Sequence, residues 1–388
     1  MTALTGLMIV ETAERVVGEY AARLLADFGA EVIKVERPGG APSRAMGPFA
    51  KGVSGLFAFL NTNKKSVVLD LSHQADRARL DALLARADAL IDDHDETWCA
   101  MHALGAAAVA GAHPALVHCS ITPFGQGAPL DKYRAYPINI SNAGGWAYHT
   151  RTGRGAAAPP LAGAGRFLPD YEAGLDAALA ASASLWRKRR TGMGQFIDIS
   201  EVQTQLSRAD VVLGRLLAGD DEPAESPTRY DMGGPAACFA CADGHVYLFM
   251  TTRAHWHGLR ALMGDPAWAA EFADDWLEFH CTPERVELFR NLFRPWIAAQ
   301  HKARISDQAQ ALNVPLVPIN TAQDLRDNAQ YRHRGYFQAL QDPVLGMLEY
   351  PTVPYRMSAS PVRLQSAAPA LPVGTPGGKQ RGAGRRPG

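Results

Sequence analysis

The order of apolar segments at the start of the chain is the strongest constraint on its fold. Residues 7–10 form a short apolar run that is typical of a buried strand. Apolar residues then recur at helical spacing from Tyr20 to Phe28, and Gly29 is a natural helix terminator. Residues 31–36 predict a second strand. A strand, a helix and a strand joined by short links predict parallel pairing with a right-handed crossover.

The same alternation continues along the chain, so we expect an α/β fold with an open, Rossmann-like parallel sheet. Ligands of such sheets bind beyond the carboxyl ends of the strands. The further segments are strands at residues 66–71, 89–91 and 115–122 and a helix at residues 76–87.

A change of composition divides the chain into parts. Proline and acidic residues between residues 219 and 231 are typical of a linker. We expect residues 1–224 to be the first part of a large α/β domain, residues 225–325 a small α+β domain, and residues 326–366 a return segment to the large domain. Residues 367–388 hold almost no bulky apolar side chain and predict a disordered basic tail.

Local signals define the elements of the small domain. Asp243 and Gly244 separate two apolar runs, which predicts a hairpin. Thr282 before Pro283 is typical of the first residues of a helix. Thr321 with Asp324 resembles a capping box, so a second helix should begin there.

Overall charge and cysteine usage exclude several classes of protein. Lys and Arg number 39, as do Asp and Glu, so no global charge favours nucleic acid or an anionic membrane. No apolar run approaches the roughly 18 residues of a membrane helix, and the N-terminus lacks the order of a signal peptide, so we expect a cytoplasmic protein. Five scattered cysteines predict reduced thiols. Cys238 and Cys241 lack a second pair, so we expect no metal site.

Asp170 is the acid most suited to chemistry. It follows Pro169 and precedes a helical run over residues 171–187. One interpretation is structural, because Asp is a preferred N-cap. The other is chemical, because a carboxylate at a helix N-terminus is favoured in its ionised form and can attack an activated acyl group. A nicotinamide dehydrogenase is disfavoured, since residues 11–20 contain one glycine and no dinucleotide fingerprint.

Six segments, which span nearly the whole chain, match one known family in the order in which they occur. They are residues 23–40, 43–48, 59–71, 116–129, 190–200 and 312–325. Together they resemble the family III CoA-transferases, the group that includes the formyl-CoA:oxalate and carnitine CoA-transferases. The resemblance implies an open α/β large domain, a small domain and two subunits threaded through each other as an interlocked homodimer.

The resemblance also implies a reaction. The family nucleophile is an Asp just before the helix that leads to residues 190–200, and Asp170 stands there. The implied activity moves CoA from an acyl-CoA thioester to a small carboxylic acid through aspartyl anhydride and aspartyl-CoA intermediates. Coenzyme A and acyl-CoA are substrates, and no permanently bound cofactor is implied.

The family match assigns further residues to CoA and to the acyl group. Val16 and Val17 match the loop near the thioester, and Arg37 matches a nucleotide contact. Lys132 is a further cofactor-binding candidate. Tyr136 is a candidate for the acyl pocket. Gly233 and Gly234 resemble a shortened glycine lid over the reactive Asp, while Arg44, Lys64 and Lys65 are basic residues that either contact CoA or face solvent.

Two departures from the family pattern keep alternatives open. Asp93, His94 and Asp95 replace an Asn-Phe-Arg-Pro-Gly type segment, and carboxylates there would repel phosphates. A non-catalytic subunit of a hetero-oligomer is therefore one alternative. The other is an acyl-CoA isomerase or racemase, although Tyr136 and Pro137 replace the His-Asp pair that the racemase branch uses.

Overall fold

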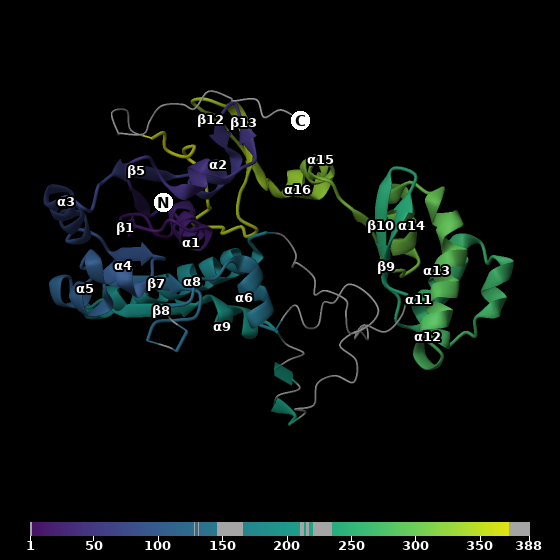
Figure 1. The fold of residues 1–388 in the computed structure, drawn as a ribbon. Coiled ribbons are helices and arrows are strands. Elements are labelled where there is room, and N and C mark those ends of the chain that lie inside the picture. The colour runs from purple at the N-terminus through teal and green to yellow at the C-terminus, as the bar shows by residue number, and fades with distance from the viewer. Residues whose placement is uncertain are drawn as a thin grey trace, which may run out of the picture. The chain divides into compact units, whose positions relative to one another are not determined.

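The computed structural model describes residues 2–127, 129–130, 132–145, 166–209, 213–214, 217–219 and 235–371. The chain forms two compact units. One consists of Met1–Pro227 with Gly335–Gly388, and the other of Thr228–Arg334. The chain therefore leaves the first unit after the central sheet is complete and returns to it near its C-terminus (Figure 1).

A six-stranded parallel sheet is the centre of the first unit. Its order is β5-β2-β1-β6-β7-β8, which confirms the predicted α/β class with a parallel sheet. The chain builds β2 and β5 on one side of β1 and then adds β6, β7 and β8 on the other. The topological switch point therefore lies at the carboxyl ends of β1 and β6, and open α/β sheets bind ligands at such a point. The strands are β1 Met8–Glu11, β2 Glu31–Glu36, β5 Lys64–Val68, β6 Ala89–Asp92, β7 Val117–Thr122 and β8 Phe196–Ser200.

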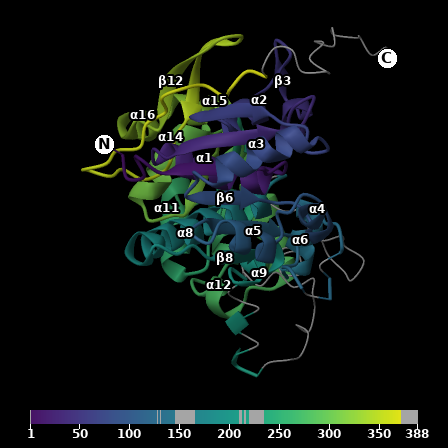
Figure 2. The same ribbon diagram turned by 90° about the vertical axis from the view of Figure 1, so that its left-hand side faces the viewer.

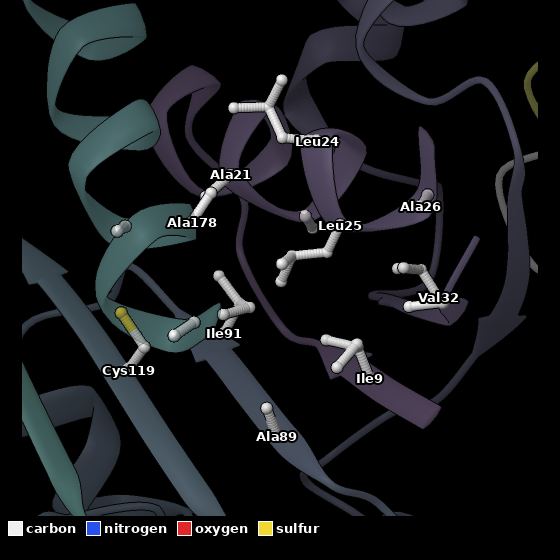
Figure 3. Packing of buried hydrophobic residues seen from close by; sticks show 14 of the residues in the cluster. Ile9, Ala21, Leu24, Leu25, Ala26, Val32, Ala89, Ile91, Cys119 and Ala178 are labelled. Carbon is white, nitrogen blue, oxygen red and sulfur yellow. The ribbon is translucent and has the colours of Figure 1, made fainter. Parts of the chain in front are cut away.

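Helices cover both faces of this sheet. On one face α1 (Val16–Asp27) and α8 (Leu168–Thr191) enclose an apolar core. Figure 3 shows Ala178 of α8 beside Ala21 of α1, near Ile91 and Cys119 of the sheet. On the other face α3 (Gln74–Leu84), α4 (Glu96–Met101) and α5 (Ala106–Ala112) lie together over a second core (Figure 2).

Smaller elements complete the first unit. The return segment forms an antiparallel pair of strands. Residues 372–388, most of the predicted tail, lie outside the described residues. The smaller elements are the 3₁₀ turn Pro42–Ala45, β3 Phe49–Ala50, β4 Val53–Ser54, α2 Gly55–Leu60, α6 Pro137–Ala143, α9 Glu201–Leu206, β12 Phe337–Asp342 and β13 Gly346–Pro351.

The second unit packs helices against a three-stranded antiparallel sheet of order β11-β10-β9. The predicted hairpin is present, and Thr282 accepts a hydrogen bond from the Arg285 N–H as the expected cap. The predicted capping box at Thr321 is also present. The elements are β9 Ala237–Cys241, β10 Gly244–Leu248, α11 Arg253–Met263, the 3₁₀ turn Ala267–Glu271, α12 Trp276–Phe279, α13 Pro283–Ala298, α14 Lys302–Ala311, β11 Leu316–Ile319, α15 Ala322–Asp327 and α16 Ala329–Arg334.

Candidate active site

Asp170 lies in the first turn of α8 and is almost fully buried, with 3% of its surface exposed. The expectation that it caps the helix is wrong. Phe167 occupies the N-cap position, and Asp170 is the third residue inside the helix, after Pro169. Proline is favoured in the first turn, where its missing N–H costs no helical hydrogen bond. Helix capping therefore does not explain the acid.

Close packing between α8 and α1 brings Asp170 to the start of α1. A Cβ on Gly174 would lie 2.7 Å from the Val17 carbonyl oxygen, so only glycine permits this approach. One turn later Ala178 packs beside Ala21, so the two helices advance in the same direction (Figure 3). Asp170 precedes Gly174 by one helical turn and therefore faces the residues just before Val17.

The segment before α1 is fixed by Asp93 from the loop after β6. The backbone N–H groups of Glu14 and Arg15 donate to its two carboxylate oxygens at 2.9 Å each. A Cβ on Gly18 would lie 2.7 Å from Asp93 Oδ2, so glycine is required there too. Burial raises the pKa of Asp93 to about 6, although the charges of His94 and Arg15 oppose the shift. Asp93 thus anchors the loop at the topological switch point.

The neighbouring acids also have internal partners. Asp92 accepts hydrogen bonds from Thr12 Oγ1 at 2.7 Å and from His94, whose Nδ1 lies 2.8 Å from Asp92 Oδ2. Asp95 accepts from the Trp98 N–H as the N-cap of α4. These contacts give residues 92–95 a role in the fold. That they weaken CoA binding stays a prediction.

Arg15 and Glu201 form an ion pair beside the nucleophile candidate. Arg15 Nη1 lies 2.5 Å from Glu201 Oε1, and Glu201 is fully buried where β8 passes into α9. Burial and the negative charge of Glu201 raise the pKa of Asp170 to about 7, against the opposing charge of Arg15. Among the described residues Asp170 Oδ2 accepts no hydrogen bond. The ionised form expected from the helix N-terminus is thus disfavoured, and the carboxyl group titrates near neutral pH.

The predicted CoA contacts differ in exposure. Val16 and Val17 belong to the first turn of α1, not to a loop, and their side chains are buried, so they can offer a ligand only backbone groups. Arg37 follows β2, is more than half exposed, and its Nε lies 3.4 Å from Glu14 Oε1. Lys132 is exposed. These geometries leave Arg37 and Lys132 accessible to a phosphate.

The predicted pocket residues are less well defined by the structure. Tyr136 precedes α6 and is 75% exposed. Its backbone N–H donates to Asn139 Oδ1 at 2.9 Å. Gly233 and Gly234 lie outside the described residues. The assignment of these three residues to an acyl pocket or lid stays a prediction.

Three basic residues with two open interpretations have structural partners. Lys64 is buried, and its Nζ lies 2.7 Å from Glu11 Oε2. Arg44 forms two 2.7 Å hydrogen bonds to Glu36. Lys65 is mostly exposed and pairs with Glu31. Lys64 and Arg44 therefore support the fold, and Lys65 faces solvent.

Sequence reasoning missed Arg15, Glu201 and the anchoring role of Asp93. Asp93 and Glu201 stand directly after strands of one parallel sheet, and Arg15 lies in the short segment between β1 and α1. The carboxyl ends of such strands meet at one edge. Glu201 follows β8 immediately, and Asp93 follows β6 immediately. Charged residues just after the predicted strands at residues 7–10 and 89–91 were an available signal for Arg15 and Asp93, whereas no predicted strand precedes Glu201.

Comparison with known proteins identifies the family. A model of the family described as CoA-transferase family III matches residues 4–374. The chain belongs to this family. Succinyl-CoA:(R)-benzylsuccinate CoA-transferase subunit BbsE of Thauera aromatica is 26% identical over 369 residues, which cover 91% of this chain and 88% of the relative. Mouse succinyl-CoA:glutarate CoA-transferase is 27% identical over 364 residues, covering 92% and 81%.

Solved structures agree with this family III assignment. A CaiB/BaiF family protein from Brucella suis has a TM-score of 0.80 at 26% identity, and the match covers 95% of this chain and 96% of the other. The predictions of family and of enzyme class are confirmed, so the protein is an acyl-CoA:carboxylate CoA-transferase. No helix within the described ranges is long and apolar enough to cross a membrane.

Proposed function

We propose that this family III transferase uses Asp170 as a covalent nucleophile. The observation that carries the proposal is a buried carboxyl group with one oxygen that holds no hydrogen bond within the described part of the chain. A fold seldom leaves a buried carboxylate oxygen without a hydrogen bond, because the desolvation cost is then not repaid. A reactive role accounts for that cost.

The chemistry proceeds in balanced steps. The Asp170 carboxylate attacks the thioester carbonyl, the C–S bond breaks, and a mixed anhydride and CoA thiolate form. The thiolate attacks the aspartyl carbonyl of the anhydride and releases the donor acid, leaving an aspartyl-CoA thioester. An acceptor carboxylate then attacks this thioester to give a second anhydride and CoA thiolate. The thiolate finally attacks the acyl carbonyl, which yields the new acyl-CoA and regenerates the Asp170 carboxylate.

Burial supports this sequence in two ways. Anhydrides hydrolyse readily, so a site closed to bulk water preserves the intermediate. The raised pKa of about 7 also makes the ionised Asp170 a stronger base than an ordinary aspartate, while leaving a large ionised fraction at neutral pH.

We propose succinyl-CoA as the CoA donor of this enzyme. The benzylsuccinate, mesaconate and glutarate relatives carry succinyl-CoA in their names. The backbone of Val16 and Val17 would face the thioester end, and Arg37 and Lys132 would face CoA phosphates. Tyr136, Gly233 and Gly234 would line or cover the acyl group.

A homodimer also belongs to the proposal. Four large apolar side chains on α8, Leu168, Leu175, Leu179 and Trp186, are spaced by seven, four and seven residues and are all more than a third exposed. This spacing places them on one helix face. A second subunit would bury that face, which is opposite to the small residues packed on α1.

The test is chemical trapping with peptide mapping. The protein is incubated with succinyl-CoA and hydroxylamine, which converts an aspartyl anhydride or thioester to a hydroxamate. We expect the hydroxamate at Asp170, and loss of both label and turnover in Asp170→Asn. Asp176→Asn is a matched control on the same helix, because Asp176 pairs with Arg208 away from Asp170. Normal transfer by Asp170→Asn would refute the mechanism.

A further inference from the structure

Arg15 holds a partly exposed guanidinium group near Asp170, and the covalent steps proposed above give this group no contact with the substrate. We propose that Arg15 binds the distal carboxylate of a dicarboxylic acyl group, and so makes this enzyme select dicarboxylic over monocarboxylic substrates of equal length. This inference rests on the proposed function and specifies its substrate class. It is argued from the backbone, the charges and the geometry around Arg15.

The backbone of Arg15 is held firmly. Its N–H donates to Asp93 Oδ2 at 2.9 Å, and the Glu14 N–H donates to the other oxygen. Lys34 Nζ donates a hydrogen bond to the Ala13 carbonyl oxygen at 3.0 Å. The loop is therefore fixed on both sides, which preorganises the side chain that it carries.

The side chain of Arg15 is oriented but not saturated. Nη1 contacts Glu201, and 28% of the side-chain surface is exposed. A guanidinium has five N–H donors in a planar fork, and this geometry matches a carboxylate bidentately. Asp93 and Asp170 also interact electrostatically with Arg15, and among the described residues only Glu201 is within ion-pair distance of its guanidinium group. Glu201 can thus hold one edge of the fork while another edge receives a ligand.

Nearby cations cannot take this role, because their donors are already used. Lys34 Nζ contacts Glu11, Glu19 and the Ala13 carbonyl. Lys64 Nζ contacts Glu11, the Glu19 carbonyl and Asn61. An ammonium group has three donors, and both side chains are fully buried. Arg15 is the accessible cation of this group.

The position of Arg15 fits the far end of an acyl chain held at Asp170. The contact of Gly174 with the Val17 carbonyl sets Asp170 over the start of α1, where Arg15 is the preceding residue. Glu201, Asp93 and Asp170 surround this point with acids. A second carboxylate on the substrate would be repelled there without Arg15, whereas a methyl group would need no cation.

The experiment compares succinyl-CoA with butyryl-CoA, two four-carbon thioesters that differ only in a terminal carboxylate or methyl group. The rate of hydroxamate formation at Asp170 is measured with each thioester, so every variant carries its own internal control. We expect Arg15→Gln to slow labelling by succinyl-CoA about 10- to 100-fold, the range of a lost charge-assisted hydrogen bond. Removing the Arg15 charge also raises the pKa of Asp170, so labelling by butyryl-CoA should fall as well, but by a smaller factor.

Two further variants sharpen the result. Arg15→Lys keeps the charge but not the fork, so its succinyl-CoA rate should lie between those of wild type and Arg15→Gln. Arg79→Gln is a matched control, because Arg79 is 59% exposed and pairs with Asp76 on α3. Equal losses with both thioesters in Arg15→Gln, or no loss with either, would overturn the Arg15 assignment alone. Absence of label from the wild type with both thioesters would overturn the proposed function as well.

Discussion

Burial has two opposite effects on the carboxyl group of Asp170. It makes the ionised form costly, and the pKa rises from 3.8 to about 7. It also removes the water and hydrogen bonds that would lower the reactivity of the proposed nucleophile. Glu201 adds to the shift and Arg15 opposes it, so the ion pair between these two residues sets the balance. The pKa of Asp170 thus depends on its own burial as well as on Glu201 and Arg15.

In the proposed mechanism, acylation should depend on pH chiefly through Asp170, while Asp93 titrates nearby with a pKa of about 6. Only ionised Asp170 attacks, so we expect kcat/KM for succinyl-CoA to rise about tenfold per pH unit below pH 7 and to level off above it. Initial rates between pH 5 and 9 measure the profile. Glu201→Gln removes a charge that raises the pKa of Asp170, so its midpoint should move to lower pH. A midpoint near 4 in the wild type would contradict this account.

Stability provides an independent check on the same pKa. Between about pH 4 and 7 the folded protein retains a proton on Asp170 that the unfolded chain has lost, so the free energy of unfolding falls as pH rises through that window. The cost is about 1.4 kcal/mol for each pKa unit. Asp170→Asn should therefore melt at a higher temperature than wild type at pH 8, and this gain should disappear toward pH 4.

Sequence reasoning singled out Asp170, whose role stays a prediction, and missed its charged neighbours Arg15 and Glu201. The match to a family segment located Asp170, but its surroundings depend on residues far apart in sequence. Arg15 and Glu201 follow the first and last strands of the parallel sheet in chain order, and nothing local links them. Strand order decides which loops meet, and local pattern does not specify strand order.

Helix α8 has one face of small buried residues and an opposite face of large exposed apolar residues. Small residues, Ala173, Gly174, Ala177, Ala178 and Ala181, are buried toward α1 and the sheet. Large apolar residues form the exposed stripe on the opposite side. The small face allows the close approach that places Asp170 over the start of α1. Helix α8 therefore positions Asp170 in the candidate site and also contributes side chains to the core.

Gly174→Ala tests this role of α8, because two effects have opposite signs. Helix propensity alone predicts a gain of about 1 kcal/mol from replacing glycine inside a helix. The added Cβ would lie 2.7 Å from the Val17 carbonyl oxygen, a backbone atom that cannot easily move. We expect a net loss of about 1–3 kcal/mol in denaturant unfolding, with slower acylation at Asp170.

The matched control for that change lies on the exposed part of the same helix. Ala183→Gly should lose about 1 kcal/mol through propensity without altering acylation, because Ala183 lies on the exposed side of α8, more than three helical turns from Asp170. A stabilised Gly174→Ala variant with full activity would show that α8 does not need this close approach.

Elements with local signals were predicted well, and those that depend on distant partners were not. The first crossover has the expected strands and helix because short links leave one arrangement. The cap at Thr282 and the capping box at Thr321 are confirmed for the same reason. Strand β8 and helix α9 were not predicted as elements, since β8 gains its place only by pairing with β7.

At the scale of the whole molecule, the sheet order explains where the site forms. Successive strands are added on one side of β1 up to β5 and on the other side from β6 onward. Strands β1 and β6 are neighbours, and their register pairs Glu11 with Ile91. The loops that follow, with Arg15 and Asp93, therefore meet at the carboxyl edge of the sheet. Glu201 arrives there from β8 at the edge of the sheet. The candidate site thus lies at the topological switch point between β1 and β6, where open α/β sheets bind their ligands.

The exposed stripe on α8 predicts that the active form is a homodimer. Leu179 and Trp186 are 68% and 65% exposed, and burying a large apolar side chain contributes about 1.5–3 kcal/mol. We expect light scattering after size exclusion to give a dimer for the wild type and a monomer for the double variant Leu179→Lys with Trp186→Glu. Met101→Lys, at an exposed apolar position on α4, should remain a dimer. A monomeric wild type with full transferase activity would contradict the prediction, whereas a dimer that survives the double change would place the interface elsewhere and leave this stripe without a partner.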